Sequence, residues 1–209
     1  MKVLGISCSP RPGQTTDRLV QEVLNNIEAP TEFVSLSGRR IGPCLGCLGC
    51  VADNVCKVRD DMGELRPLIV EADALVIGAP NYFGMLNGLA HCFLERLYQF
   101  RHQEGGALHG KLGVAVGVGS AMPDSAVRDI EKFFSFSRIE PVGNVTAIGP
   151  ASCFNCGHGE ECREGAIHRV FGPGTKITAD LTPNLSKQPD SLTAARTLGE
   201  KLTQRLKQG

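Results

Sequence analysis

Four closely spaced cysteines are the most chemically distinctive residues in this chain. They lie between residues 44 and 56 with the spacing C-x2-C-x2-C-x5-C: Cys44, Cys47, Cys50 and Cys56. Tandem x2 gaps let three thiolates meet one face of an iron–sulfur cubane while the fourth folds over it, as in ferredoxin motifs. Zinc sites more often use two separated C-x2-C knuckles or include histidine, and residues 31 to 90 contain no histidine. The spacing therefore favours a [4Fe-4S] cluster, with zinc or free packing thiols as the alternatives.

The composition of the chain narrows these alternatives. Its 209 residues are 42% hydrophobic, enough to bury one core, so we expect a single domain over residues 1–209. Lys plus Arg and Asp plus Glu number 22 each, which favours neither nucleic acid nor a membrane as a partner. We see neither a signal peptide nor a membrane-spanning apolar run, and expect a cytoplasmic protein with reduced thiols. Nine cysteines, an odd number, also argue against a disulfide framework.

A second group of cysteines lies near the end of the chain. Cys153-x2-Cys156-Gly has the form of a metal knuckle, in which the small Gly157 lets backbone N–H groups point at a thiolate. Cys162 would be a third ligand. Candidates for a fourth ligand are His158, His168, Cys8, Cys92 and an exogenous group. We expect a second iron–sulfur cluster or a zinc site here, and the alternative is an irregular loop with incidental cysteines.

Strand and helix patterns alternate along the chain and would position these residues. Short apolar segments predict strands at residues 2–7, 31–36, 72–80, 111–119 and 144–149. Apolar residues at three- and four-residue spacing predict helices at residues 16–27, 62–72, 87–100, 124–136 and 191–207. This alternation is typical of an α/β fold, a doubly wound five-stranded parallel sheet with helices on both faces. Two cysteine-containing insertions interrupt it, residues 38–60 after the second strand and residues 151–190 after the fifth.

Ligands of such sheets bind outside the carboxyl ends of the strands, so the loops after strands form the candidate site. The first loop, SCSPRPGQTT, offers hydroxyls, N–H groups and the Arg11 guanidinium to a phosphate at a helix N-terminus, although it could be an ordinary capped turn. The third, APNYFGMLNG, suits a flat heteroaromatic ring, although Tyr82 and Phe83 could instead cap the core. The fourth presents Gly119 and Ser120, whose small size allows close approach. Together these loops predict an FMN site.

Three stretches resemble the flavodoxin-like NAD(P)H-dependent FMN reductase family, in particular its iron–sulfur flavoprotein branch: GISCSPRPGQTT, CLGCLGCVADNVCKVRDDM and ADALVIGAPNYFGMLNGLAHCFLER. The resemblance covers about residues 1–150. It implies a flavodoxin-like fold and a [4Fe-4S] cluster on the four compact cysteines. It also implies an FMN site formed by Ser9, Arg11, Gln14, Thr15, Thr16, Pro80, Asn81, Tyr82, Phe83 and Gly84. Cys8 and Gln14-Thr15 depart from the Gly and Gly-Asn that are common in the family.

These features predict an oxidoreductase. A flavin exchanges electrons singly or in pairs, whereas a cubane passes one at a time, so the two together connect one-electron and two-electron partners. We therefore expect electron transfer from a one-electron donor such as ferredoxin, through flavin, to a small-molecule acceptor. One alternative is an NAD(P)H-dependent FMN or quinone reductase whose cysteines bind zinc or are structural, and another is a redox-sensing binding module. The resemblance also implies a homodimer or homotetramer.

Overall fold

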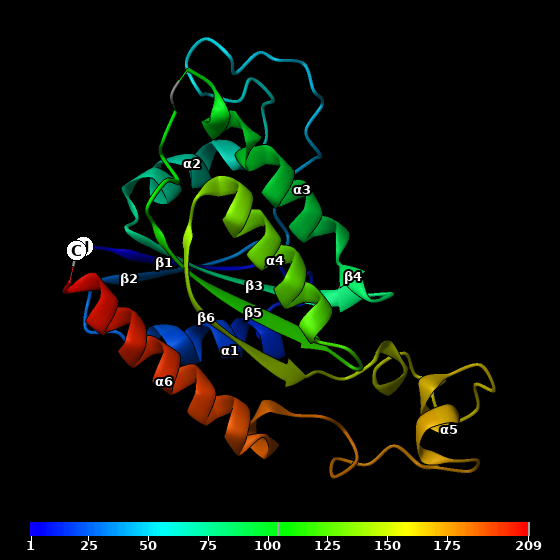
Figure 1. The fold of residues 1–209 in the computed structure, drawn as a ribbon. Helices are drawn as coiled ribbons and strands as arrows, with labels where there is room; N and C mark the ends of the chain where they lie inside the picture. Colours follow the sequence, from blue (N-terminus) through cyan, green and yellow to red (C-terminus); the bar gives the residue numbers. More distant parts are fainter. Residues whose placement is uncertain (104, 209) are drawn as a thin grey trace.

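A parallel sheet runs through the centre of the protein (Figure 1). The computed structural model describes residues 1–103 and 105–208. The strands of this sheet are β1 (Val3–Ser7), β2 (Thr31–Ser35), β3 (Ala74–Tyr82), β5 (Leu112–Gly119) and β6 (Glu140–Ile148). They pair in parallel in the order β2-β1-β3-β5-β6, and Val3 lies opposite both Thr31 and Ala74. This arrangement confirms the predicted five-stranded, flavodoxin-like sheet.

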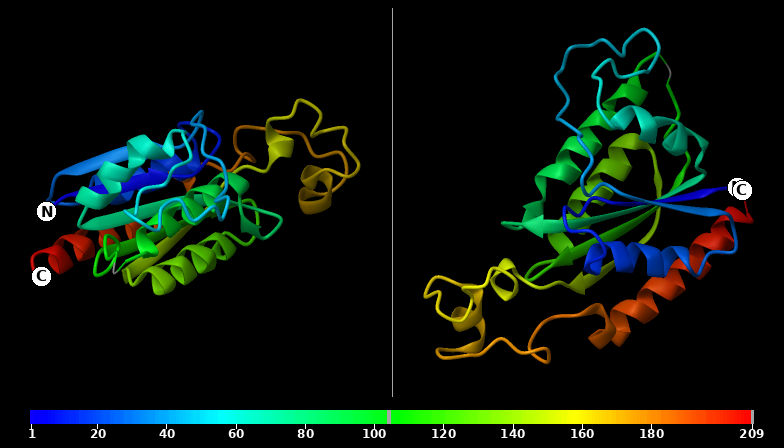
Figure 2. Two further views of the ribbon diagram at one scale, coloured as in Figure 1. Left: turned by 90° about the horizontal axis from the view of Figure 1, so that it is seen from above. Right: turned by 180° about the vertical axis from the view of Figure 1, so that it is seen from behind.

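Helices cover both faces of the sheet (Figure 2). Helices α1 (Thr15–Leu24) and α6 (Pro189–Leu206) pack on one face, and α2 (Met62–Glu71), α3 (Gly88–Arg96) and α4 (Asp124–Ser137) pack on the other. Successive strand residues alternate between the two cores, so that Val3 packs with α1 and α6 whereas Leu4 packs with the other three helices. Burial on both faces explains why these strands are almost continuously apolar. Within the described residues, no helix is long and apolar enough to cross a membrane.

Three elements differ from the prediction. Strand β6 begins at Glu140, four residues earlier than expected, because an edge strand tolerates Pro141. Helix α3 ends at Arg96 and continues as a 3-10 helix, η1 (Leu97–Arg101). A short strand, β4 (Met85–Leu86), pairs antiparallel with β3 through a two-residue turn, in which Phe83 and Gly84 have φ of 55° and 75°. Both positive values suit a type I′ hairpin turn, but phenylalanine is unusual there and gave no hairpin signal.

The two predicted insertions lie at different places on this sheet (Figures 1 and 2). Residues 36–61, between β2 and α2, form a long loop beside α3. Residues 149–188 leave the carboxyl end of β6, project beyond the sheet and return to α6. This second segment contains a 3-10 turn, η2 (Ser152–Phe154), a short helix, α5 (Ala166–Phe171), and a second 3-10 turn, η3 (Leu185–Lys187). The sequence analysis expected no helix there, because six residues are too few to display an amphipathic period.

Candidate functional site

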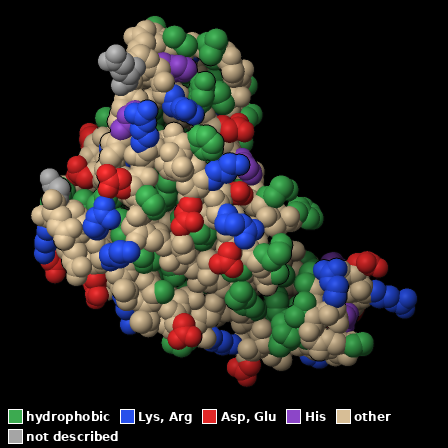
Figure 3. Space-filling model, viewed as in Figure 1, with side chains coloured by type: hydrophobic (Ala, Val, Ile, Leu, Met, Phe, Trp, Pro, Cys, Tyr) green, Lys and Arg blue, Asp and Glu red, His purple; other side chains and the backbone are tan. Residues whose placement is uncertain are grey.

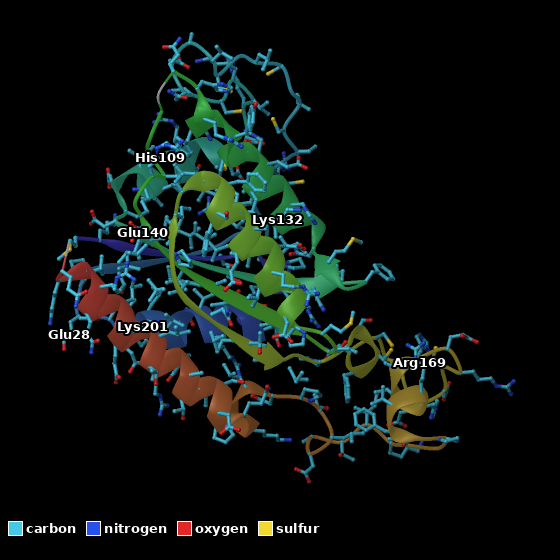
Figure 4. The ribbon with its side chains drawn as sticks, in the orientation of Figure 1. Glu28, His109, Lys132, Glu140, Arg169 and Lys201 are labelled. Carbon is cyan, nitrogen blue, oxygen red and sulfur yellow. The ribbon has the colours of Figure 1, made fainter. Side chains whose placement is uncertain are left out.

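A cavity of about 720 Å³ opens where the loops after β1, β3, β5 and β6 meet. Of the residues predicted to bind FMN, it is lined by Arg11, Pro80, Asn81, Tyr82, Phe83, Gly84, Gly119 and Ser120. It is also lined by residues 149–153 after β6, by Glu164, and by Ala166 and Arg169 of α5. Figure 4 labels Arg169. Small-molecule sites typically enclose about 300–1,000 Å³. The cavity therefore has the size and the position expected of a cofactor site in this fold.

The loop after β1 leads into the N-terminus of α1. Thr15 and Thr16 are buried in the first turn, and the exposed Gln14 precedes them as the N-cap residue. Within the described chain, no side-chain hydrogen bond caps this helix, so it is not the capped turn that was the alternative. Thr15 Oγ1 lies beside the cavity wall, 3.7 Å from where a Cβ on Gly149 would stand. Anion binding by the N–H groups of this first turn stays a prediction.

A buried aspartate fixes the shape of this loop. Asp17 is 3% exposed, and its carboxylate accepts hydrogen bonds from Ser7 Oγ at 2.5 Å and from the Gly13 N–H at 2.8 Å. These bonds join the end of β1 to the far side of the loop. The sequence analysis missed Asp17 because an aspartate in the first turn of a helix is expected simply as a partner of the helix dipole.

Ser9 and Arg11 play different parts in the loop. Ser9 Oγ accepts the Arg11 N–H and donates to the Arg11 carbonyl, both at 3.1 Å, so the loop itself engages this hydroxyl. The Arg11 guanidinium instead reaches across the cavity mouth, where Nη2 donates to the Pro150 carbonyl at 3.3 Å. Arg11 is thus the predicted phosphate-binding residue whose side chain lines the cavity.

The ring loop, residues 80–84, presents aromatic groups outward. Phe83 is fully exposed and Tyr82 is 44% exposed, so neither caps the core. Asn81 Nδ2 donates to the carbonyls of Ala121 and Met122 at 2.7 Å, and therefore braces the loop after β5. A Cβ on Gly119 would stand only 2.4 Å from Asn81 Oδ1, so this close approach requires glycine.

The four compact cysteines line one small cavity of about 20 Å³. Cys44 and Cys47 are exposed, and Cys50 and Cys56 are half-buried. Burial raises the pKa of the Cys50 thiol, and the three neighbouring cysteines raise it further. Across residues 1–103 and 105–208, no three His, Cys, Asp or Glu side chains are spaced to hold one metal ion. The four thiols line the same hollow, and an all-thiol set of this kind fits an iron–sulfur cluster.

Helix α3 and the turn that follows it hold both ends of the compact cysteine motif. Glu95 Oε2 accepts the N–H of Cys44 at 3.2 Å, and Gln99 Oε1 accepts the N–H of Cys56 at 3.1 Å. Gln99 is itself buried. The first and last cysteines are therefore positioned through their backbones by side chains of one continuous helical stretch.

A buried ion pair closes the base of the same loop. The side chains of Arg96 and Asp60 are 1% and 11% exposed, and two guanidinium nitrogens donate to the carboxylate at 2.5 and 3.0 Å. Arg96 also donates to the Gly42 carbonyl at 3.3 Å. Burial opposes ionisation of Asp60, but Arg96 and the N–H groups of Gly42 and Met62 outweigh it and lower the pKa. The sequence held one signal for this buried pair: Arg96 falls on the apolar face of the helix predicted at residues 87–100.

The second cysteine group, Cys153, Cys156 and Cys162, adjoins the 720 Å³ cavity through Cys153. Cys153 and Cys162 are half-buried, and Cys156 is exposed. Gly157 has a φ of 80°, the positive value that the predicted knuckle requires. The role of these cysteines as metal ligands stays a prediction.

Known proteins resemble this chain in both sequence and fold. The profile of the family described as NADPH-dependent FMN reductase matches residues 1–151. An iron–sulfur flavoprotein of Methanocaldococcus jannaschii is 36% identical over 150 residues, which are 69% of this chain and 77% of that protein. An iron–sulfur flavoprotein of Methanosarcina thermophila is 29% identical over 142 residues, 66% and 74% of the two chains.

Solved structures support the fold. RosB, determined with 8-demethyl-8-formylriboflavin-5'-phosphate, matches with a TM-score of 0.66 at 15% identity and covers 100% of this chain and 81% of its own. The Trp repressor binding protein from Bacillus subtilis matches with a TM-score of 0.58 at 17% identity and covers 94% and 98%. At such low identities the likeness concerns the fold alone.

Proposed function

Because the chain belongs to the NADPH-dependent FMN reductase family, we propose that it is an oxidoreductase that binds FMN and a [4Fe-4S] cluster. The observation that carries this proposal is the convergence of Arg11, residues 80–84 and Gly119 on one cavity at the carboxyl edge of the sheet. Relatives named iron–sulfur flavoproteins, one of them 36% identical to this chain, support the cluster.

The residues at the cavity fit the parts of FMN. The Arg11 guanidinium and the first-turn N–H groups of α1 suit the phosphate, because both favour a dianion. Residues 80–84 suit the isoalloxazine ring, since Tyr82 offers an aromatic face and the hairpin turn exposes its backbone. Gly119 keeps that wall of the cavity free of side-chain bulk.

The compact cysteines, Cys44, Cys47, Cys50 and Cys56, would hold the cluster. Helix α3 begins directly after the hairpin that carries the ring loop, and its last turn anchors the cysteine motif. At 1.5 Å per residue its nine residues span about 14 Å, so one rigid element connects the two sites. A cubane passes single electrons and a flavin accepts one or two, so together they would couple a donor such as ferredoxin to a small acceptor.

Anaerobic purification followed by cofactor analysis tests this proposal. We expect one FMN per chain and about four irons with matching acid-labile sulfide that depend on the compact cysteines. The Cys44→Ser/Cys47→Ser variant should lose this iron and keep FMN, whereas Cys92→Ser, on α3 outside both cysteine groups, should keep both. FMN without iron or sulfide after anaerobic reconstitution would overturn the cluster.

A second candidate is an NAD(P)H-dependent FMN or quinone reductase, because the matching family is described as NADPH-dependent. The two candidates differ in the donor. If reduced ferredoxin bleaches the flavin rapidly and NADPH does not, the first is supported. Rapid bleaching by NADPH alone, equally fast in the Cys44→Ser/Cys47→Ser variant, selects the second.

A further inference from the structure

The projecting segment, residues 151–184, folds with almost no hydrophobic core. Its only fully buried apolar side chain among the described residues is that of Ile167, and neither of the two sheet-facing core clusters includes a residue of the segment. Val170 and Phe171 of α5 stay exposed at 67% and 43%. Figure 3 shows the segment standing away from the body, with charged side chains at its outer end.

Hydrophobic burial cannot hold a segment of this kind in one conformation. Burying a single isoleucine stabilises a fold much less than the loss of backbone conformational entropy over the whole segment destabilises it. Small units without a core usually depend on disulfides or a bound metal. The segment has three cysteines, which are free thiols in the described residues, so a metal bound by thiolates is one way in which it could be held.

Two backbone N–H groups already point at these sulfurs. The His158 N–H donates to Cys156 Sγ at 3.4 Å, immediately after the Gly157 turn. The Ala166 N–H donates to Cys153 Sγ at 3.3 Å. Hydrogen bonds of this type stabilise thiolates and orient metal ligands. The backbone of the knuckle therefore offers N–H groups to two of the three sulfurs.

Cys162 returns to the same place. A Cβ on Gly165 would stand 3.4 Å from Cys162 Sγ, directly before the Ala166 N–H that contacts Cys153. The Cys162 N–H also donates to the His158 carbonyl at 3.0 Å, which ties this cysteine to the knuckle. Among the described residues no three ligands are yet spaced for one ion. Rotation of the cysteine side chains on binding would bring them together, since metal binding and folding are coupled.

The structure also narrows the choice of a fourth ligand. Both ring nitrogens of His168 already face backbone carbonyls, Nε2 that of Glu160 at 2.5 Å and Nδ1 that of Gly172 at 3.3 Å. Cys8 is buried in the core beneath the sheet, and Cys92 lies on α3. His158 is exposed and sits between Cys156 and Cys162 in sequence. Its exposure and its position in the sequence leave it as the candidate fourth ligand.

We propose that Cys153, Cys156, Cys162 and His158 form a second metal site, for a thiophilic metal, which orders the projecting segment against the flavin cavity. Three cysteines and one histidine are a common donor set of structural Zn²⁺ sites. The site adjoins the cavity because Cys153, Ala166 and Arg169 line its wall. All four proposed ligands lie after residue 151, where the match to the family profile ends.

Metal analysis of matched variants tests this site. Cys153→Ser/Cys156→Ser should lose about one zinc per chain while its FMN and the iron of the compact cysteines remain. Cys92→Ser is the control and should lose nothing. His158→Ala should release zinc to a chelator faster than the wild type. If the double variant loses iron and not zinc, the cysteine site stands and holds a cluster; unchanged metal content overturns the proposal.

The Cys153→Ser/Cys156→Ser variant could lose its metal simply because it misfolds. A metal titration of protein whose second cysteine group is intact separates the two explanations. In the Cys44→Ser/Cys47→Ser background, Co²⁺ added to metal-free protein should produce thiolate-to-cobalt absorption, and the projecting segment should become resistant to trypsin. If neither change occurs, the proposal fails. Because FMN and the compact cluster are measured separately, this result leaves the proposed function untouched.

Discussion

The two cysteine-containing regions of this protein are held in place by different means. Residues 38–60 are tied to α3 and η1 by the buried Arg96–Asp60 pair and by hydrogen bonds that the backbone N–H groups of Cys44 and Cys56 donate to Glu95 and Gln99. Residues 151–184 are tied mainly to themselves, through the N–H···S bonds and short local hydrogen bonds. Neither region has a large core of its own.

On the proposal that both regions bind a metal, this difference separates two kinds of metal site. Where the body of the protein anchors a loop, the cysteines stay in position whether or not the metal is bound. Where the loop is anchored only to itself, the metal must provide much of the ordering, as in small zinc-binding units. Metal removal should therefore leave the compact loop placed and loosen the projecting segment.

The largest expected effect comes from the anchor of the compact region. Arg96→Leu should lower the free energy of unfolding by about 3–5 kcal/mol, because it leaves Asp60 buried without its partner. Iron bound to the compact cysteines should fall with it. Arg39→Leu, which breaks a more exposed pair with Glu64, should cost less than about 1 kcal/mol. Chemical denaturation measures both, and equal losses would contradict the anchoring role.

The next largest effect is expected at Arg11, which lines the cavity and donates a hydrogen bond to Pro150 just before the projecting segment. Arg11→Ala should weaken FMN binding by about 1.5–3 kcal/mol, because it removes a charge-assisted contact to the phosphate. The same change removes the bond to Pro150, just before the segment begins. Flavin fluorescence gives the affinity.

Two variants sharpen this measurement. Arg11→Lys should recover part of the affinity as a point charge, and Arg128→Ala, an exposed change on α4, should have no effect. Iron bound to Cys44, Cys47, Cys50 and Cys56 should be the same in all of these variants, since these cysteines and Arg11 line different cavities. Unchanged FMN affinity in Arg11→Ala would remove it from the phosphate site.

Local patterns in the sequence predicted the scaffold and the loops that line the cavity. Alternating strands and helices fix which loops follow strands, and a parallel sheet brings those loops to one edge. Arg11, Tyr82 and Gly119 could be found this way because each lies at or shortly after the carboxyl end of a strand. The turn at Gly157 was also predictable, since CxxCG demands a positive φ there.

Residues that act across long sequence separations could not be found in this way. Asp17 meets Ser7, ten positions earlier, only once α1 packs against the sheet, although its bond to the Gly13 N–H is local. Arg96 meets Asp60 across 36 positions, and a single sequence carries no signal for such a pair. The ring-loop hairpin was hidden for another reason, because Phe83 takes a turn position that normally favours asparagine or glycine.

Acid titration should distinguish the anchored region by its pH dependence. The folded-state pKa of Asp60 is lowered, with Arg96 and two backbone N–H groups outweighing the effect of burial. Its contribution to stability is therefore complete above the unfolded pKa of about 3.9 and is lost as pH falls through the folded value. The unfolding free energy of Asp60→Asn should fall less steeply than that of the wild type between about pH 5 and pH 2. Parallel slopes would rule out this contribution.

The smallest effect is expected from the ion pair of the projecting segment. Lys176 Nζ lies 2.8 Å from Glu160 Oε2, with side chains 76% and 33% exposed, and the pair lowers the pKa of Glu160. Glu160 Oε1 also accepts the Ile177 N–H at 2.8 Å, and this bond survives the loss of the lysine. Lys176→Ala should therefore raise the rate of chymotryptic cleavage within the segment only slightly.

The dependence on salt concentration distinguishes the exposed Lys176–Glu160 pair from the buried Arg96–Asp60 pair. Exposed charges are screened over about 10 Å at 0.1 M salt, whereas a buried pair is screened much less. The small difference between Lys176→Ala and the wild type should thus vanish at high salt, while the loss caused by Arg96→Leu should persist. If both effects faded together, the Arg96–Asp60 pair would be solvent-accessible, and the contrast between an anchored and a self-held cysteine region would fail.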